Sequence, residues 1–172
     1  MTTVFSGHRI DDPGRPTPRF PDARIAVVRG WISERIAPGD LCLSSLANGA
    51  DILFAEACRA AGADHHIVLP SNPDRFIETS VRTATPGDWV ARFRAIWDAT
   101  PARHRHVLGT TDDYDACNRA LIAMALEAPP PRRLLAVWDG IDTGRPGGTG
   151  SMVTLAREAG LEVEILDPRP QG

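Results

Sequence analysis

The sequence contains no lysine, because each of its 19 basic residues is an arginine. Mechanisms that need a lysine nucleophile, a Schiff base or the lysine of a P-loop are therefore excluded. The 22 acidic residues leave a formal net charge of −3 at pH 7. Since domains that bind nucleic acids are usually basic, this balance argues against nucleic acid as the main partner.

Cysteines and long apolar runs are also scarce. The three cysteines, Cys42, Cys58 and Cys117, are far apart and form no C-x-x-C pair, so we expect buried free thiols in a reducing compartment. The longest fully apolar run, residues 134–138, is far shorter than the roughly 20 residues of a membrane helix. The first residues show no signal-peptide pattern. The sequence therefore predicts a cytoplasmic protein without membrane association.

The remaining composition suits one domain spanning residues 1–172, since 42% of the residues are apolar and 24% are charged. Short β-type runs alternate with longer helical patterns. Strands are predicted at residues 3–6, 41–45, 66–69, 106–108, 134–138 and 163–166, and helices at 21–37, 50–61, around 89–97, from 110–113 to 127, and from about 150 to 159. This alternation predicts a Rossmann-like α/β three-layer sandwich with a mainly parallel sheet. In such sheets ligands bind at the carboxyl ends of the strands.

The first two strand ends carry candidate ligand-binding residues. After the first strand stand Gly7, His8 and Arg9, where glycine allows close approach of a ligand and arginine suits phosphate; a plain turn with solvated side chains is the alternative. Asn48, Gly49 and Asp51 follow the second strand and begin a helix. Asp51 is a candidate either for helix capping or for ligand contact.

Asp139 and Gly140 directly follow the buried strand at 134–138, so we expect them at the same carboxyl edge of the sheet. The carboxylate of Asp139 is a candidate for ribose hydroxyls or for orienting a water, and bonding its own turn is the alternative. The glycine-rich turn that follows precedes a helix, the context of a phosphate cradle. Its candidate ligand-binding residues are Gly147, Gly148, Thr149, Gly150 and Ser151.

Other residues give weaker signals. Asn118 lies one turn into its helix and is a candidate for ligand contact or for contact with a neighbouring loop. Glu56 interrupts an apolar helix and is either a buried acid or base with a raised pKa or an exposed side chain. The histidine pairs at 65–66 and 104–106 lack a cysteine or carboxylate at ligand spacing, so no metal site is predicted.

Taken in order along the chain, Gly7-His8-Arg9, Asn48-Gly49-Ala50-Asp51, Asp139-Gly140 and Gly147-Gly148-Thr149 resemble the SLOG superfamily. This superfamily groups Rossmann-like domains related to the LOG phosphoribohydrolases and to the DprA/Smf DNA-processing proteins. The chain looks closest to a branch whose members are proposed to sense nucleotides, often in bacterial conflict systems. The resemblance implies that the Gly147 turn holds a phosphate and that Gly7 and Asn48-Gly49 line the sugar or base.

One position departs from the LOG pattern. Thr154 stands where the LOG enzymes carry the glutamate of their catalytic site, and cleavage of an N-glycosidic bond needs a carboxylate. We therefore predict a cytosolic nucleotide sensor without a cofactor, in which Arg9, helped by Arg15 or Arg19, pairs with phosphate. The alternative is an N-glycosidic hydrolase that uses Asp139 or Glu56. The sequence leaves two further partners open. One is a second copy of the chain, with the helix at 50–61 as the dimer face, and the other is an effector protein.

Overall fold

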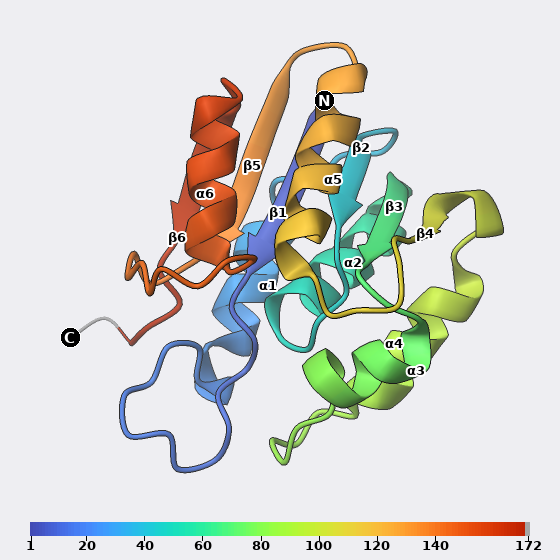
Figure 1. Cartoon of the computed structure of the whole chain (residues 1–172). Coiled ribbons are helices and arrows are strands. Elements are labelled where there is room, and N and C mark those ends of the chain that lie inside the picture. Colours follow the sequence, from blue (N-terminus) through green and yellow to red (C-terminus); the bar gives the residue numbers. More distant parts are fainter. Residues whose placement is uncertain (171–172) are drawn as a thin grey trace.

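A six-stranded parallel sheet runs through the centre of the molecule, with helices on both of its faces (Figure 1). The computed structural model describes residues 1–170. The strands are β1 (Thr2–Gly7), β2 (Leu41–Ser44), β3 (Asp64–Leu69), β4 (Arg105–Val107), β5 (Arg132–Val137) and β6 (Glu162–Leu166). Their order in the sheet is β4-β3-β2-β1-β5-β6, and every neighbouring pair is parallel.

The helices divide between the two faces of the sheet. One face is covered by α1 (Ile25–Ser33), α2 (Ala50–Ala61) and α4 (Trp89–Ala99), and the other by α5 (Tyr114–Glu127) and α6 (Thr149–Glu158) (Figure 1). Four shorter helical segments connect them: η1 (Asp22–Arg24), α3 (Pro73–Phe76), the π-helical turn η2 (Ile77–Val81) and η3 (Ala102–His104). Among residues 1–170, no helix has the length and apolar character needed to cross a membrane.

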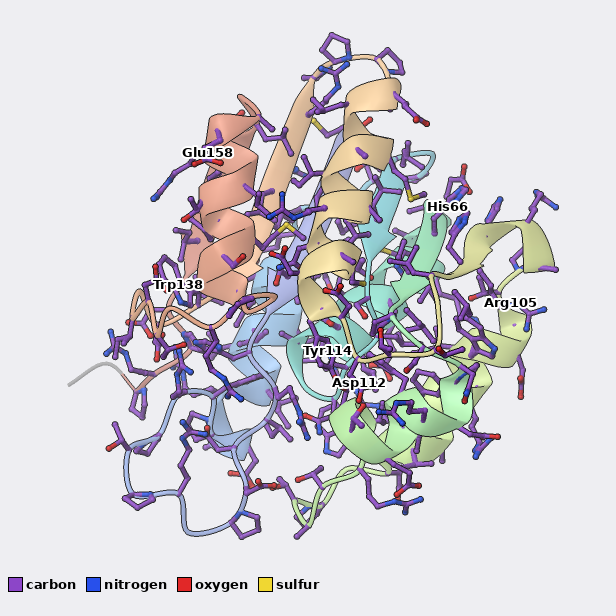
Figure 2. All side chains as sticks on the ribbon, viewed as in Figure 1. His66, Arg105, Asp112, Tyr114, Trp138 and Glu158 are labelled. Atoms are coloured by element: carbon purple, nitrogen blue, oxygen red, sulfur yellow. The ribbon has the colours of Figure 1, made fainter. Side chains whose placement is uncertain are left out.

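The chain reverses its direction of travel across the sheet at β1. From β1 it moves to β2, β3 and β4 on one side, whereas β5 and β6 lie on the other side. The connections at the carboxyl ends of β1 and β5 therefore diverge, which leaves room for a ligand at that edge. In Figure 2 the labelled Trp138, just after β5, and Tyr114, the first residue of α5, both lie at this edge.

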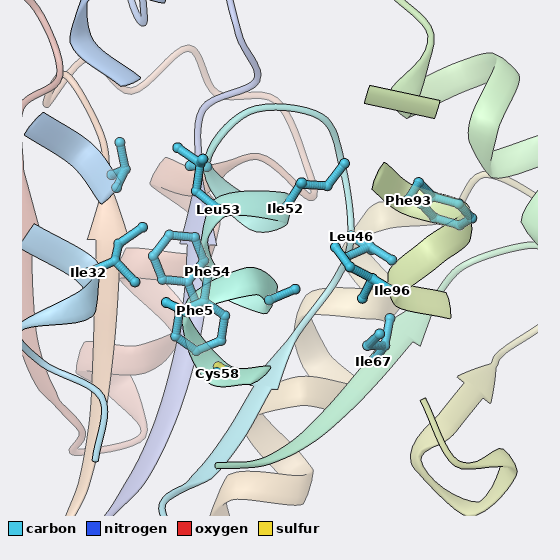
Figure 3. Packing of buried hydrophobic residues seen from close by; sticks show 14 of the residues in the cluster. Phe5, Ile32, Leu46, Ile52, Leu53, Phe54, Cys58, Ile67, Phe93 and Ile96 are labelled. Carbon is cyan, nitrogen blue, oxygen red and sulfur yellow. The ribbon is translucent and has the colours of Figure 1, made fainter. Parts of the chain in front are cut away.

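Two apolar clusters hold the layers together, one on each face. Side chains alternate along a strand, so Phe5 and Val4 of β1 enter different clusters. Phe5 stacks on Phe54 of α2 with ring centroids 4.4 Å apart (Figure 3). Because eight of the twelve residues of α2 are buried, this helix belongs to the core, and that answers the question of a dimer face that its sequence left open.

The predicted α/β fold with a parallel sheet is confirmed, and all six predicted strands are present. The first helix is shorter than the predicted span of 21–37, because residues 22–24 form a 3-10 turn and the α-helix ends at Ser33. The helical segment at 73–81 was not predicted. Its signals were Asn72, whose side chain accepts a hydrogen bond from Arg75 N–H, and Pro73 in the first turn.

Candidate functional site

A cleft of about 490 Å³ opens at the carboxyl ends of β1 and β5, beside the beginning of α6. Its volume lies in the range of small-molecule sites. Its walls come from the end of β1 and the following loop, from the segment between β2 and the first turn of α2, from α3 and η2, from the first turns of α5, and from the segment between β5 and α6. Twelve of the residues predicted from the sequence line it: Gly7, His8, Arg9, Arg15, Arg19, Asp51, Asn118, Gly147, Gly148, Thr149, Gly150 and Ser151.

The glycine-rich turn presents an uncapped helix end to this cleft. Gly148 is the N-cap of α6, and within residues 1–170 no side chain caps the helix. The N–H groups of the first turn, at Thr149, Gly150 and Ser151, have no acceptor within an α-helix. These amides and the positive end of the helix dipole favour an anion at this wall of the cleft.

Close packing against α5 fixes the position of this turn. Gly147 has a φ of +78°, and a Cβ atom there would lie 2.3 Å from Tyr114 Cβ, so only glycine fits. Asn118 Nδ2 donates a hydrogen bond of 3.3 Å to the Gly148 carbonyl. The Ser6 hydroxyl lies 3.4 Å from that of Thr149. The turn is therefore tied both to α5 and to β1.

Asp139 is enclosed beside the cleft and does not line it. Its side chain is fully buried, and Arg19 donates two hydrogen bonds to it, of 2.6 and 3.0 Å. His8 Nε2 lies 3.0 Å from Oδ1, which also accepts a 3.1 Å hydrogen bond from Ile141 N–H. Burial alone would raise the pKa of Asp139, but these hydrogen bonds outweigh it and hold the pKa well below its usual range. Asp139 is thus an ionised group whose oxygens are engaged, and the adjoining Gly140 forms an exposed turn with a φ of +77°.

The buried imidazole of His8 forms part of the wall between Asp139 and the cleft. Burial lowers the pKa of His8, and its hydrogen bond with Asp139 opposes that effect only in part. Arg9, the next residue, extends to η2, where Nη1 donates a 3.1 Å hydrogen bond to the Thr79 carbonyl. The guanidinium of Arg9 therefore also ties two walls of the cleft together.

Asn48 and Gly49 support the cleft from behind and do not line it. Asn48 Oδ1 accepts a hydrogen bond from Ile10 N–H, and its Nδ2 donates to the Val81 carbonyl. Gly49, with a φ of +83°, packs so closely on the loop after β1 that a Cβ atom would lie 2.4 Å from Ile10 N. This pair fixes the loops that form the cleft.

Asp51 is the buried carboxylate that does line the cleft. Its residue is only 7% exposed, and Oδ2 accepts a 3.2 Å hydrogen bond from Ala47 N–H. Its Oδ1 is buried without a hydrogen-bond partner in the part of the chain that the structure describes. Burial raises the pKa of Asp51 to about 7, although backbone N–H groups oppose that effect. Asp51 therefore exchanges a proton near neutral pH.

Glu56 is not brought to this site. It lies on α2 outside the cleft, where Arg92 donates two hydrogen bonds to it, of 2.6 and 2.8 Å. Arg29 lies within 3.8 Å of the same carboxylate. Glu56 therefore forms an ion pair between α2 and α4.

The sequence reasoning missed the aromatic and hydroxyl side chains of the cleft. Phe76, Tyr114 and Trp138 line it, and the hydroxyl of Tyr114 hydrogen-bonds to Ser80 Oγ at 2.7 Å. Phe76 and Ser80 lie in the helical segment that was not predicted. For Trp138, its position directly after a buried strand was a usable signal. Comparison of the chain with protein-family models, with curated proteins and with solved structures found no match.

Proposed function

We propose that this cleft binds a nucleotide or a nucleotide-derived small molecule, whose phosphate meets the beginning of α6. The observation that carries the proposal is the uncapped first turn of α6, which lines a cleft of about 490 Å³ at the switch point of the sheet. Free amide groups and a helix dipole stabilise a phosphate there without a lysine. The resemblance of the Gly147 turn to the phosphate cradle of the SLOG superfamily supports the same assignment.

The other walls suit the remaining parts of a nucleotide. Tyr114 and Trp138 offer aromatic surface to a base, and the hydroxyls of Thr79 and Ser80 offer polar contacts. Arg9 and Arg145 line the cleft and add positive charge. Since these groups bind, and Thr154 stands where the LOG enzymes carry their catalytic glutamate, binding without cleavage is the primary function that we propose, in keeping with a sensor.

Titration calorimetry with a panel of nucleotides tests this proposal. The panel holds adenosine and guanosine mono-, di- and triphosphates, the two nucleosides and inorganic phosphate. We expect at least one nucleotide to bind about tenfold or more tightly than its nucleoside, because the end of α6 contributes up to about 2 kcal/mol to an anion. Equal affinity of nucleotides and nucleosides, or no binding by any member, would contradict the proposal.

A matched pair of charge substitutions locates the phosphate. Gly148→Glu places a carboxylate at the end of α6 and should abolish the advantage of nucleotide over nucleoside. Gly30→Glu makes the same change on the exposed side of α1, where a Cβ atom meets nothing within 4 Å, and should bind as the unmodified protein does. Unchanged nucleotide binding by Gly148→Glu would place the phosphate elsewhere.

A second candidate function is cleavage of the N-glycosidic bond of the same ligand. The observation in its favour is Asp51, a carboxylate in the cleft with an unpartnered oxygen and a pKa of about 7. A carboxylate with such a pKa is suited to acid–base catalysis at neutral pH. Mass spectrometry would detect a free base after long incubation with a bound nucleotide, and Asp51→Asn should then abolish its release. Thr154, whose hydroxyl donates to the Gly150 carbonyl and does not line the cleft, offers no carboxylate.

A further inference from the structure

The sheet edge formed by β3 and β4 brings together three side chains that can bind a metal ion. They are Asp64 and His66 of β3 and His104 of η3, and one nitrogen or oxygen atom from each lies within 4.8 Å of the other two. Asp64 Oδ1 is 3.3 Å from His104 Nδ1 and 3.8 Å from His66 Nε2. Asp64 begins β3, so this group lies at the end of the strand opposite to the nucleotide cleft (Figure 2, His66).

Strand periodicity and register produce this arrangement. Alternate residues of a strand point to the same face, which places Asp64 and His66 together. The parallel pairing of β3 with β4 aligns Ile67 with Arg105, and therefore aligns His66 with His104 across the edge. Their imidazole rings are stacked with centroids 4.1 Å apart, and a nitrogen of each ring lies within 4 Å of the same Asp64 oxygen.

A fourth side chain orients His66. His106 Nε2 lies 3.1 Å from His66 Nδ1, the ring nitrogen on the side away from Asp64. When His66 Nδ1–H donates to His106, Nε2 is left with a free lone pair on the side of Asp64. Histidine ligands of metals usually make such a hydrogen bond through their second nitrogen, because it fixes the tautomer and the ring orientation.

We propose that Asp64, His66 and His104 bind a divalent transition metal ion such as Zn²⁺, with His106 positioning His66. Two imidazoles and one carboxylate are the donors that Zn²⁺ and its neighbours Co²⁺, Ni²⁺ and Cu²⁺ accept. Tetrahedral Zn²⁺ with ligands at about 2.0–2.1 Å sets its donor atoms about 3.3–3.4 Å apart. The separations of 3.3 and 3.8 Å from Asp64 come close to that spacing, and the two histidine nitrogens lie within 4.8 Å of each other. Binding then requires a small rotation of the exposed Asp64 carboxylate and a tilt of the two stacked rings, so that both nitrogen lone pairs point at the ion.

The surroundings also suit a bound ion. The side chains of His66 and His104 are 20% and 14% exposed, so both ligand rings are held by packing. Asp64, with 52% of its side chain exposed, leaves the site open to solvent, and a water molecule or a group from another molecule completes the coordination.

Cobalt titration of the full chain, after removal of metals with EDTA, tests the proposal. We expect one Co²⁺ per chain and the visible absorption of tetrahedral Co²⁺, which one equivalent of Zn²⁺ displaces. His104→Gln and Asp64→Asn remove a ligand and should each weaken binding by more than tenfold. His106→Gln should weaken it by about 10–100-fold while the ligand set is retained.

Two controls separate loss of the site from loss of the fold. Asp98→Asn neutralises an exposed aspartate on α4 that lies outside the group and should bind Co²⁺ as the unmodified protein does. In EDTA, Asp64→Asn should melt at the same temperature as the unmodified protein, because its side chain is exposed. Absence of 1:1 binding, or full affinity in both His104→Gln and Asp64→Asn, would overturn the proposal. Nucleotide binding at the cleft should be the same with and without metal.

Discussion

The ion pair between Arg19 and Asp139 predicts a large loss of stability when Arg19 is replaced by methionine. Methionine keeps most of the apolar part of the side chain and removes the charge. It leaves the Asp139 carboxylate, whose side chain is fully buried, without the two hydrogen bonds of 2.6 and 3.0 Å that Arg19 donates. A buried charge that loses its partner is strongly destabilising.

The magnitude follows from the contacts that remain. Breaking a buried ion pair typically costs about 3–5 kcal/mol. Arg19 is 24% exposed, and His8 and Ile141 N–H still contact the carboxylate, so we expect a loss of about 2–4 kcal/mol. A loss of about 3 kcal/mol lowers the Tm of a domain of this size by roughly 6–12 °C.

Urea unfolding followed by tryptophan fluorescence measures this loss, and the four tryptophans supply the signal. The matched control is Arg15→Met in the same loop. The side chain of Arg15 is 45% exposed, and it lies 3.5 Å from Asp11, so its loss should cost less than about 1 kcal/mol. Equal losses for the two variants, or a loss below about 1 kcal/mol for Arg19→Met, would refute the reasoning.

The pH dependence of the same variant has a definite sign. In the unmodified protein the pKa of Asp139 lies below its unfolded value, so the ion pair stabilises the fold above about pH 4 and is lost only as pH falls through the lower, folded pKa. Without Arg19, burial raises the pKa of Asp139, and the carboxyl becomes neutral at a higher pH. The stability difference between the two proteins should therefore be largest near pH 7 and smaller near pH 4.

Three further outcomes follow from the structure. Gly147→Ala should lower the free energy of unfolding by more than about 1–2 kcal/mol, because Gly147 has a left-handed φ and a Cβ atom there would lie 2.3 Å from Tyr114 Cβ. In the same urea titration, Gly148→Ala should change the free energy of unfolding little, because its Cβ atom would meet only the Arg145 carbonyl, at 3.4 Å. Asp51, with a pKa raised to about 7, stabilises the fold in its protonated form. This stabilisation is complete below about pH 4 and is lost as pH rises through 7. The free energy of unfolding of Asp51→Asn should therefore rise relative to that of the unmodified protein between about pH 5 and pH 8, and a constant difference in stability over that range would contradict the assignment. Glu56→Gln should leave nucleotide affinity unchanged in calorimetry, because Glu56 lies outside the cleft.

Much of the fold was predictable because it depends on sequence patterns among neighbouring residues. The six strands and the glycine-rich turn before the last helix follow from runs of apolar residues and from breakers, which act over a few neighbouring positions. The parallel sheet follows from the alternation of strands and helices, and with it the edge at which the candidate residues meet. Twelve of the predicted site residues line one cleft for this reason.

Local sequence patterns do not show which distant residue a side chain will pair with. Asp139 was a candidate for ligand contact or for bonding its own turn. The turn contact is present, since Oδ1 accepts from Ile141 N–H, but its partner Arg19, 120 positions away in the sequence, was not predicted. Glu56 was a candidate for catalysis, and its pairing with Arg92 depends on how α2 packs against α4.

The sequence by itself therefore determined the layers of this protein and the edge of the sheet that carries its candidate site. Only the tertiary structure decided which carboxylates remain available and that Asp64 and His66 meet His104 at the opposite end of β3. The physical reason is that periodicity fixes which face a residue occupies, whereas strand register and helix packing fix which distant residue it meets on that face.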